Sequence, residues 1–156
     1  MSGRATRTTA RPSGDRMTER DYSHRDVVDK LGVKPGHLVA FAEEAWQIDP
    51  GLRERIVART GRSPVVDGDV LDLVFVAADD STDAVAVLRR WKARLAPAGG
   101  IWMLSPKRGH PGYVDQRPLI TAGAAASLVD NKSCSVSDTV SAMRFVIRTK
   151  DRRTET

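Results

Sequence analysis

Short apolar runs separated by polar segments dominate the first two thirds of the chain. The strongest is VLDLVFVAA, residues 70–78, which is nearly continuous and rich in β-branched side chains. Runs of this kind are typical of parallel strands covered on both faces. Residues 37–42 and 100–105 also have strand length, and residues 63–66 are either a short strand or simply extended. The pattern therefore predicts a sheet in which residues 70–78 are the best-defined strand.

Near the C-terminus the apolar residues alternate with polar ones. Residues 132–137 and 141–149 follow this rule, with Met143 and Phe145 on one face and Arg144 on the other. A period of two is the side-chain repeat of a β-strand. The few polar residues between the two segments suit a tight turn. We expect an antiparallel hairpin here.

Four segments carry the signals of helices. Apolar side chains recur at helical spacing or small residues accumulate, and capping residues precede them. The expected helices are residues 24–31, 50–60, 82–96 and 118–130. The expected N-terminal caps are Ser23 in a capping box with Asp26, Asp49 followed by Pro50, and Ser81. Gly32 and Gly61 stand where a helix-ending glycine belongs.

Strands that alternate with helices require a parallel sheet with crossover helices. The predicted fold is therefore α/β: a three-layer, Rossmann-like, mostly parallel sheet with a C-terminal antiparallel hairpin. At 156 residues the chain has room for one ordinary domain. We expect a disordered basic arm at residues 1–21, the domain at 22–149 and a disordered basic tail at 150–156.

The net charge of +5 lies at the two ends of the chain. Residues 1–25 hold six Arg and three acidic residues, and residues 144–156 hold five basic and two acidic residues. The remaining 118 residues hold 14 basic and 15 acidic side chains. A nearly neutral body disfavours a phosphate-binding surface on the folded domain. Weak nucleic-acid contact through the basic arms stays an alternative.

Other features place the protein in the cell interior. No apolar run approaches the roughly 18 residues of a membrane span, and the N-terminus has no apolar segment typical of a secretory signal. A single Cys excludes an internal disulfide. We therefore expect a cytoplasmic protein without membrane contact.

The stretch RLAPAGGIWMLSPK, residues 94–107, resembles a segment of S-adenosylmethionine-dependent methyltransferases, and residues 70–149 resemble the C-terminal half of their fold. The ordered region from YSHRDVVDKLGVKPG to IWMLSPK more closely resembles a bacterial family, domain of unknown function 3052. This resemblance implies a compact methyltransferase-like fold without an assigned activity.

Methyltransferases bind their cofactor beside a glycine-rich turn after the first strand, where any Cβ would collide with the ligand. Here the first strand is followed by EEAWQIDPG, with Trp46 and no glycine before Gly51. We therefore expect no cofactor and a non-catalytic binding domain for a small ligand or a protein. A divergent methyltransferase is the alternative.

The polar loop at residues 105–113 is the strongest candidate for a binding site. It leaves the carboxyl end of a parallel strand, where open α/β sheets place their ligands, together with the ends of neighbouring strands. The alternatives for its parts are a solvated surface loop and, for the residues near 80, a helix cap. The candidate residues are Glu43, Glu44, Asp79, Asp80, Ser81, Ser105, Lys107, Arg108, His110 and Tyr113.

Other chemistry has little support in the sequence. Three His and one Cys never reach ligand spacing, so we expect no metal site. Cys134 on an alternating strand suits a small buried hydrophobic residue. No catalytic triad or phosphate-binding loop is present, and we assign no catalytic residue.

Overall fold

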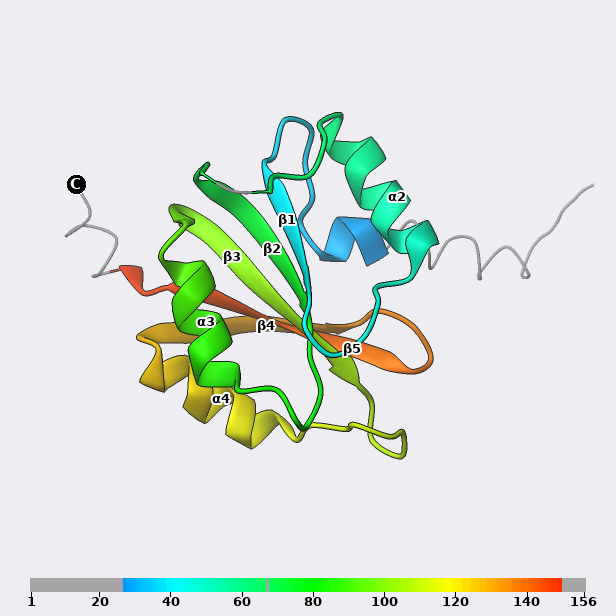
Figure 1. The fold of residues 1–156 in the computed structure, drawn as a ribbon, viewed down its shortest axis with the longest axis vertical. Coiled ribbons are helices and arrows are strands. Elements are labelled where there is room, and N and C mark those ends of the chain that lie inside the picture. The colour runs from blue at the N-terminus through cyan, green and yellow to red at the C-terminus, as the bar shows by residue number, and fades with distance from the viewer. Residues whose placement is uncertain (1–26, 67, 150–156) are drawn as a thin grey trace, which may run out of the picture. The chain divides into compact units, whose positions relative to one another are not determined.

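The computed structural model describes residues 27–66 and 68–149 (Figure 1). The chain divides into two compact units, residues 1–32 and 33–156. The predicted basic arm, the Ser23–Asp26 capping box and the C-terminal tail lie outside the described residues. In the first unit, residues 27–30 are helical, and Gly32 takes a φ of 71°. Its predicted place as the glycine that ends the helix is confirmed.

The second unit is built on a sheet of five strands. Its order is β1-β2-β3-β5-β4, with β1, β2 and β3 parallel to one another and β5 antiparallel to both β3 and β4. The strands are β1 (Val39–Glu43), β2 (Leu71–Ala77), β3 (Leu95–Pro106), β4 (Leu128–Ser135) and β5 (Val140–Ile147). The mixed α/β fold with a mostly parallel sheet and a C-terminal hairpin is as predicted.

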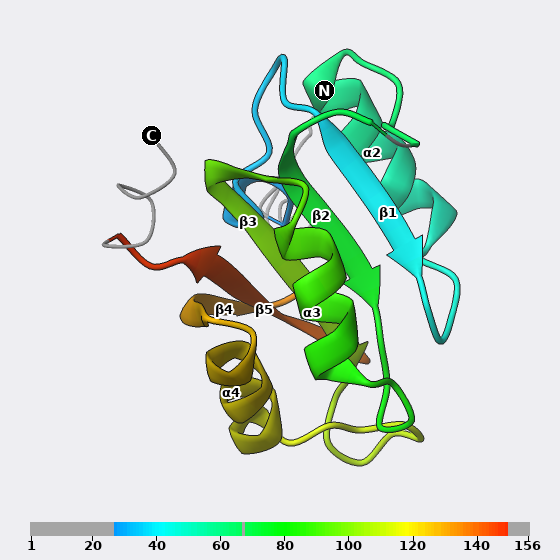
Figure 2. The ribbon, with the colours of Figure 1, turned by 60° about the vertical axis from the view of Figure 1, so that its left-hand side comes forward.

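Helices cover both faces of this sheet. They are α2 (Pro50–Thr60), α3 (Ala84–Lys92) and α4 (Gln116–Ala125). Figure 2 shows α3 and α4 in front of the sheet and α2 behind it. In β2, Val74 and Val76 belong to the apolar cluster that includes Leu88 of α3 and Leu119 of α4. Phe75, which stands between these two valines in the strand, is also fully buried. Burial on both faces explains why this strand is apolar throughout.

Helix α2 begins and ends as predicted. The carboxylate of Asp49 accepts a hydrogen bond from the amide of Leu52 at 3.0 Å, and Pro50 holds the first helical position. Gly61 follows the helix with a φ of 71°. Residues 63–66, in contrast, form no strand, although the amide of Val65 donates to the carbonyl of Val39 at 2.8 Å.

Helix α3 is shorter than predicted, because β3 begins before the glycine pair. Leu95 pairs with Leu71, the register then shifts, and pairing resumes at Gly100 with Leu73. The predicted helix end at residue 96 and strand start at residue 100 are wrong, since residues 95–99 already belong to β3. At Gly99 a Cβ would lie 2.8 Å from the carbonyl oxygen of Asp72, so a glycine lets the backbones approach.

The predicted boundary between α4 and β4 is also wrong. Helix α4 ends at Ala125 and β4 starts at Leu128, so residues 128–130 are strand and not helix. Ser127 between them has a φ of 63°, a conformation that stops a right-handed helix. In the part of the chain that the structure describes, no helix has the length and apolar character needed to cross a membrane.

Candidate functional site

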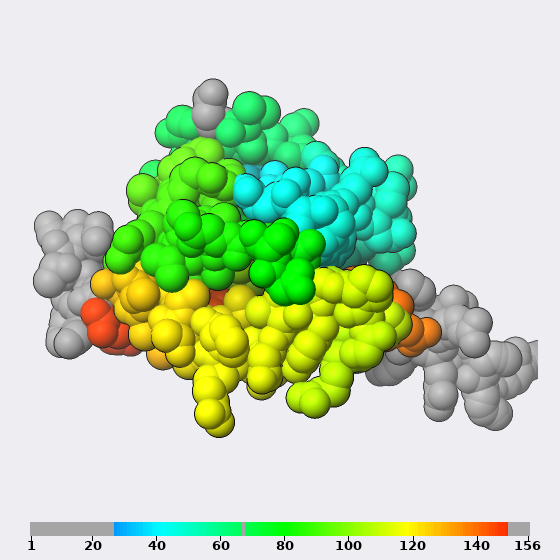
Figure 3. Space-filling model, turned by 60° about the horizontal axis from the view of Figure 1, so that its bottom comes forward, coloured from blue at the N-terminus to red at the C-terminus, as the bar shows by residue number. Residues whose placement is uncertain are grey.

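The three parallel strands end at one edge of the sheet. Glu43, Ala77 and Leu104 are register partners near the ends of β1, β2 and β3. Figure 3 shows this face of the second unit, with α4 and the β3–α4 loop beside α3 and the β1–α2 loop. Open α/β sheets bind their ligands at the carboxyl edge. All ten predicted site residues lie here, at strand ends or on the loops that follow them.

The β1–α2 loop is fastened across the end of β2. The amide of Ala45 donates to the carbonyl of Ala77 at 2.9 Å, and the indole Nε1–H of Trp46 donates to the carbonyl of Ala78 at 2.8 Å. The loop therefore covers the point where the chains of β1 and β2 leave the sheet. A half-buried tryptophan, rather than a glycine-rich turn, occupies this place.

Glu43 and Glu44 are engaged in contacts within the fold. The carboxylate of Glu43 accepts from the amide of Ile48 at 2.9 Å and pairs with Arg53 at 3.5 Å, which closes the loop and joins it to α2. Glu44 forms an ion pair with Arg90 of α3. Neither carboxylate points to a shared site with the other loops, so these two predicted residues stabilise the β1–α2 loop.

Asp79 organises the β2–α3 loop. Its Oδ1 accepts from the hydroxyl of Ser81 at 2.6 Å, from the amide of Ser81 at 2.9 Å and from the hydroxyl of Thr82 at 3.4 Å. The hydrogen bonds from the Ser81 hydroxyl and amide lower the pKa of Asp79 below its ordinary value. The predicted cap at Ser81 is wrong: Asp83 is the N-cap of α3, and its carboxylate accepts from the amide of Ala86 at 3.1 Å.

The two basic side chains of the β3–α4 loop, Lys107 and Arg108, make their contacts in different directions. The Nζ of Lys107 donates to the Oγ of Ser135 at 2.7 Å, which joins it to β4. The guanidinium of Arg108 donates to the hydroxyl of Tyr113 at 3.3 Å and lies over its ring. His110 is exposed. These four predicted residues therefore form no single constellation.

A small cavity lies between the β2–α3 and β3–α4 loops, which meet where the amide of Asp80 donates to the carbonyl of Gly112 at 3.1 Å. Its volume is about 150 Å³. Asp79, Asp80 and Ser105 are the predicted residues that the fold brings together here. The full lining is Ala78, Asp79, Asp80, Thr82, Ala84, Met103, Ser105, Val114, Pro118 and Leu119.

A second, larger cavity of about 290 Å³ adjoins the first at Ser105. Its lining is Ser105, Val114, Gln116, Leu119, Ser133, Cys134, Ser135, Ser141, Ala142 and Met143. Ser133, Ser135 and Ser141 are not among the site residues predicted from the sequence. The spacing of two between Ser133 and Ser135, on a strand that was predicted, was the available signal for one serine-bearing face.

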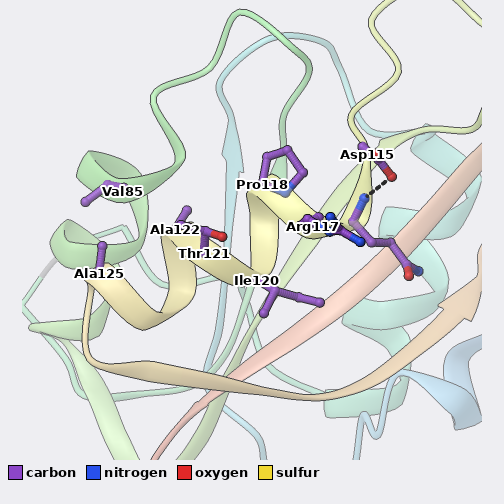
Figure 4. A pocket seen from close by; sticks show the side chains of 9 residues that line it. Val85, Asp115, Arg117, Pro118, Ile120, Thr121, Ala122 and Ala125 are labelled. Carbon is purple, nitrogen blue, oxygen red and sulfur yellow. Dashed lines mark hydrogen bonds between the residues drawn. The ribbon is translucent and has the colours of Figure 1, made fainter.

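A third concavity is an open groove of about 820 Å³ along α4 (Figure 4). Val85 of α3 and Pro118, Ile120 and Ala125 of α4 contribute to its lining. Figure 4 shows Ile120 pointing away from Val85, with Ala122 between them. Its lining also includes the polar residues Asp115, Gln116, Arg117 and Thr121. The groove shares Pro118 with the first cavity and Gln116 with the second.

Within residues 27–66 and 68–149, no group of three His, Cys, Asp or Glu side chains could hold a metal ion. The Nδ1 of His37 accepts a hydrogen bond from the amide of Lys34 at 3.2 Å, so this side chain stabilises a local turn. Cys134 is half-buried, less than the buried position expected from the sequence.

The fold is similar to that of solved methyltransferases. An O-methyltransferase (NcsB1) from neocarzinostatin biosynthesis, in complex with S-adenosylmethionine, has a TM-score of 0.56 at 17% identity, over 85% of this chain and 55% of that chain. The mitomycin 7-O-methyltransferase MmcR has a TM-score of 0.51 at 12% identity, over 81% and 54%. A methyltransferase from Pyrococcus furiosus has a TM-score of 0.50 at 14% identity, over 78% and 80%.

The chain spans about half the length of the first two of these proteins. At such low identities the likeness shows a Rossmann-like methyltransferase fold and no activity. The sequence profile of a family described as protein of unknown function (DUF3052) matches residues 28–149. None of the curated proteins matches the chain in sequence.

Proposed function

Since the chain belongs to the DUF3052 family, a family of unknown function with a methyltransferase-like fold, we propose that it is a binding domain and not a methyltransferase. In this proposal the carboxyl edge of β2 and β3 binds a small molecule or a protein partner. S-adenosylmethionine is not used.

The closed β1–α2 loop is the observation that supports this proposal. A cofactor at the end of β1 needs a backbone that it can approach closely. Here Ala45 and Trp46 are hydrogen-bonded to Ala77 and Ala78, at 2.9 Å and 2.8 Å. A cofactor would have to displace the loop and break both bonds, each of which contributes about 0.5–1.5 kcal/mol.

The cavities on either side of Ser105 support a binding role. Asp79 is ordered by its bonds to Ser81 and Thr82 before any ligand arrives. The Ser105 side chain lies between the two cavities and is 5% exposed. Polar groups that converge on a partly apolar cavity, held in place in advance, are typical of small-molecule sites.

Thermal unfolding with and without saturating S-adenosylhomocysteine tests the proposal. A ligand at 100 times its dissociation constant adds about 2.7 kcal/mol, which raises the midpoint of a domain of this size by several degrees. We expect no shift for this chain. The NcsB1 methyltransferase, crystallised with that compound, is the positive control.

A clear shift for this chain would overturn the proposal and favour the alternative, a divergent methyltransferase. That alternative draws on the fold likeness to enzymes such as NcsB1. The third hypothesis, nucleic-acid contact through the basic arms, concerns residues outside those that the structure describes.

A further inference from the structure

Three serines form a row across three neighbouring strands. Ser105 of β3 is the register partner of Ser141 of β5, and Ser141 is the register partner of Ser135 of β4. All three line the 290 Å³ cavity, together with Ser133 one step along β4. We call Ser105, Ser141 and Ser135 the serine row. Its hydroxyls come from three strands that only the tertiary fold brings together.

Two hydroxyls of the serine row have unused hydrogen-bonding capacity. Among the described residues, no hydrogen bond is made by the side chain of Ser105 or of Ser141, whereas Ser135 accepts from Lys107 and donates to the carbonyl of Ser137. Ser105 is 5% exposed. Since the Ser105 hydroxyl makes no hydrogen bond among the described residues and is not itself fully buried, it is a ready donor for a ligand at the wall of the cavity.

Lys107 brings a positive charge to the edge of the site, since it lies outside the cavity lining and contacts it through Ser135. Its Nζ lies 2.7 Å from the Oγ of Ser135, and its backbone amide donates to the carbonyl of Thr139 at 2.8 Å, which fixes the base of the side chain. An ammonium has three donors, and this contact uses one. The lining of the cavity contains no carboxylate, and the nearby Asp115 is occupied by the amide of Gln116 and the hydroxyl of Tyr113.

The other side of the cavity is apolar. Val114, Leu119 and Met143 contribute to the lining. A volume of 290 Å³ lies at the lower end of the range for small-molecule sites, about 300–1,000 Å³. The ligand must therefore be small, with one anionic end and a short apolar body.

We propose that this cavity binds a small monocarboxylate with a short hydrocarbon chain. The carboxylate accepts hydrogen bonds from Lys107 and from the hydroxyls of Ser105 and Ser141, and the hydrocarbon chain lies against Leu119 and Met143. This inference rests on the proposed binding function and names its ligand class. It requires no cofactor.

Methyl NMR of protein labelled with [methyl-¹³C]methionine tests it. Met143 lines the proposed site, and Met103 lines the neighbouring 150 Å³ cavity, so the two methyl signals report on different cavities. Sodium butyrate is expected to shift the Met143 signal saturably, more than that of Met103. Neutral butyramide, and phosphate without a hydrocarbon chain, are expected to shift it far less. Equal effects of butyrate and butyramide would overturn the role of Lys107.

Variants identify the groups that bind. Lys107→Met is expected to weaken butyrate binding by about tenfold or more, as expected for losing a hydrogen bond to a charged group. Lys132→Met removes the same charge from β4 and is the matched control, because in the described part of the chain Lys107 donates to a serine of the cavity and Lys132 does not. It is expected to bind as the wild type does. Ser105→Ala and Ser141→Ala keep the size of the side chain nearly unchanged and are also expected to weaken binding. Unchanged affinity in Lys107→Met would overturn the proposal.

The outcome of the butyrate experiment can be distinguished from the outcome of the test of the proposed function. If butyrate leaves Met143 unmoved and S-adenosylhomocysteine gives no thermal shift, the carboxylate assignment is wrong and the binding function stands. If S-adenosylhomocysteine stabilises the protein, the proposed function is wrong, whatever butyrate does.

Discussion

Trp46 and Ala78 lie 32 residues apart in the chain, and the indole N–H of Trp46 donates to the carbonyl of Ala78 at 2.8 Å. This bond joins the loop after β1 to the end of β2. Rossmann-type nucleotide-binding proteins have a glycine-rich turn after the first strand. In this chain one side chain, that of Trp46, closes the loop in that position of the fold.

Trp46→Phe is expected to lower the free energy of unfolding by about 1 kcal/mol, because it removes one hydrogen bond and leaves the Ala78 carbonyl without its partner. Urea denaturation measures this change. Trp91→Phe is the matched control: the indole nitrogen of Trp91 is buried and has no partner among the described residues, so its removal costs no hydrogen bond. An equal loss in both variants would contradict the role of the Trp46 bond.

Gly99→Ala is expected to destabilise the fold by ~1–3 kcal/mol, the usual cost of overpacking. Its Cβ would lie 2.8 Å from the carbonyl oxygen of Asp72 and 2.9 Å from that of Leu71, and backbone cannot easily move. Gly51→Ala in α2 is the control, since its Cβ meets side chains alone, at 3.1 Å and beyond. Wild-type stability in Gly99→Ala would mean that β3 does not approach β2 so closely.

Asp79→Asn tests the acid dependence of the β2–α3 loop. The pKa of Asp79 is lowered from 3.8 in the folded protein, first of all by the Ser81 hydroxyl. Its charge therefore stabilises the fold above the unfolded-state pKa, and this contribution is lost as the pH falls through the folded-state pKa. Asp79→Asn should be less stable than the wild type at neutral pH, and the two should converge in acid.

Urea denaturation across this pH range measures the difference. Asp80→Asn is the control, since within the described part of the chain the Asp80 carboxylate makes no hydrogen bond or ion pair. A difference for Asp79→Asn that persists unchanged in acid would show that its effect does not come from the charge.

Asp83→Ala is expected to cost about 0.5–2 kcal/mol, because Asp83 is the N-cap of α3. Ser81→Ala removes a hydroxyl from the same loop, at an exposed position, and should cost less. Thermal or urea unfolding of the two variants distinguishes the observed cap from the one that the sequence predicted. A larger loss in Ser81→Ala would restore Ser81 as the residue on which the start of α3 depends.

The sequence was sufficient to predict the features that depend on residues close together in the chain. Asp49 and Pro50 start α2, and Gly61 ends it, because a capping carboxylate, a fixed φ and a left-handed glycine act within one turn of the helix. The strand at residues 70–78 was equally clear from its apolar run. The order of these elements was enough to predict the α/β fold.

Features that depend on distant partners could not be predicted. The start of β3 at Leu95 depends on its pairing with Leu71, which overrides the helical pattern of the preceding residues. The same holds for the candidate site. Ser105, Ser141 and Ser135 become neighbours through the register of β3, β5 and β4, and the sequence places them up to 36 residues apart. Glu43 and Glu44 were predicted at this edge because they follow the first strand, and the fold engages both of them in ion pairs.

The indole N–H signal of Trp46, followed by NMR during titration with S-adenosylhomocysteine, tests the central claim most directly. Trp46→Phe assigns the signal, and the indole of Trp91 serves as an internal reference. If the loop is closed and the cofactor is not used, the Trp46 signal stays unmoved up to saturating ligand. A saturable shift of Trp46, with Trp91 unchanged, would show that the ligand enters beneath the loop and that the chain binds a methyltransferase cofactor.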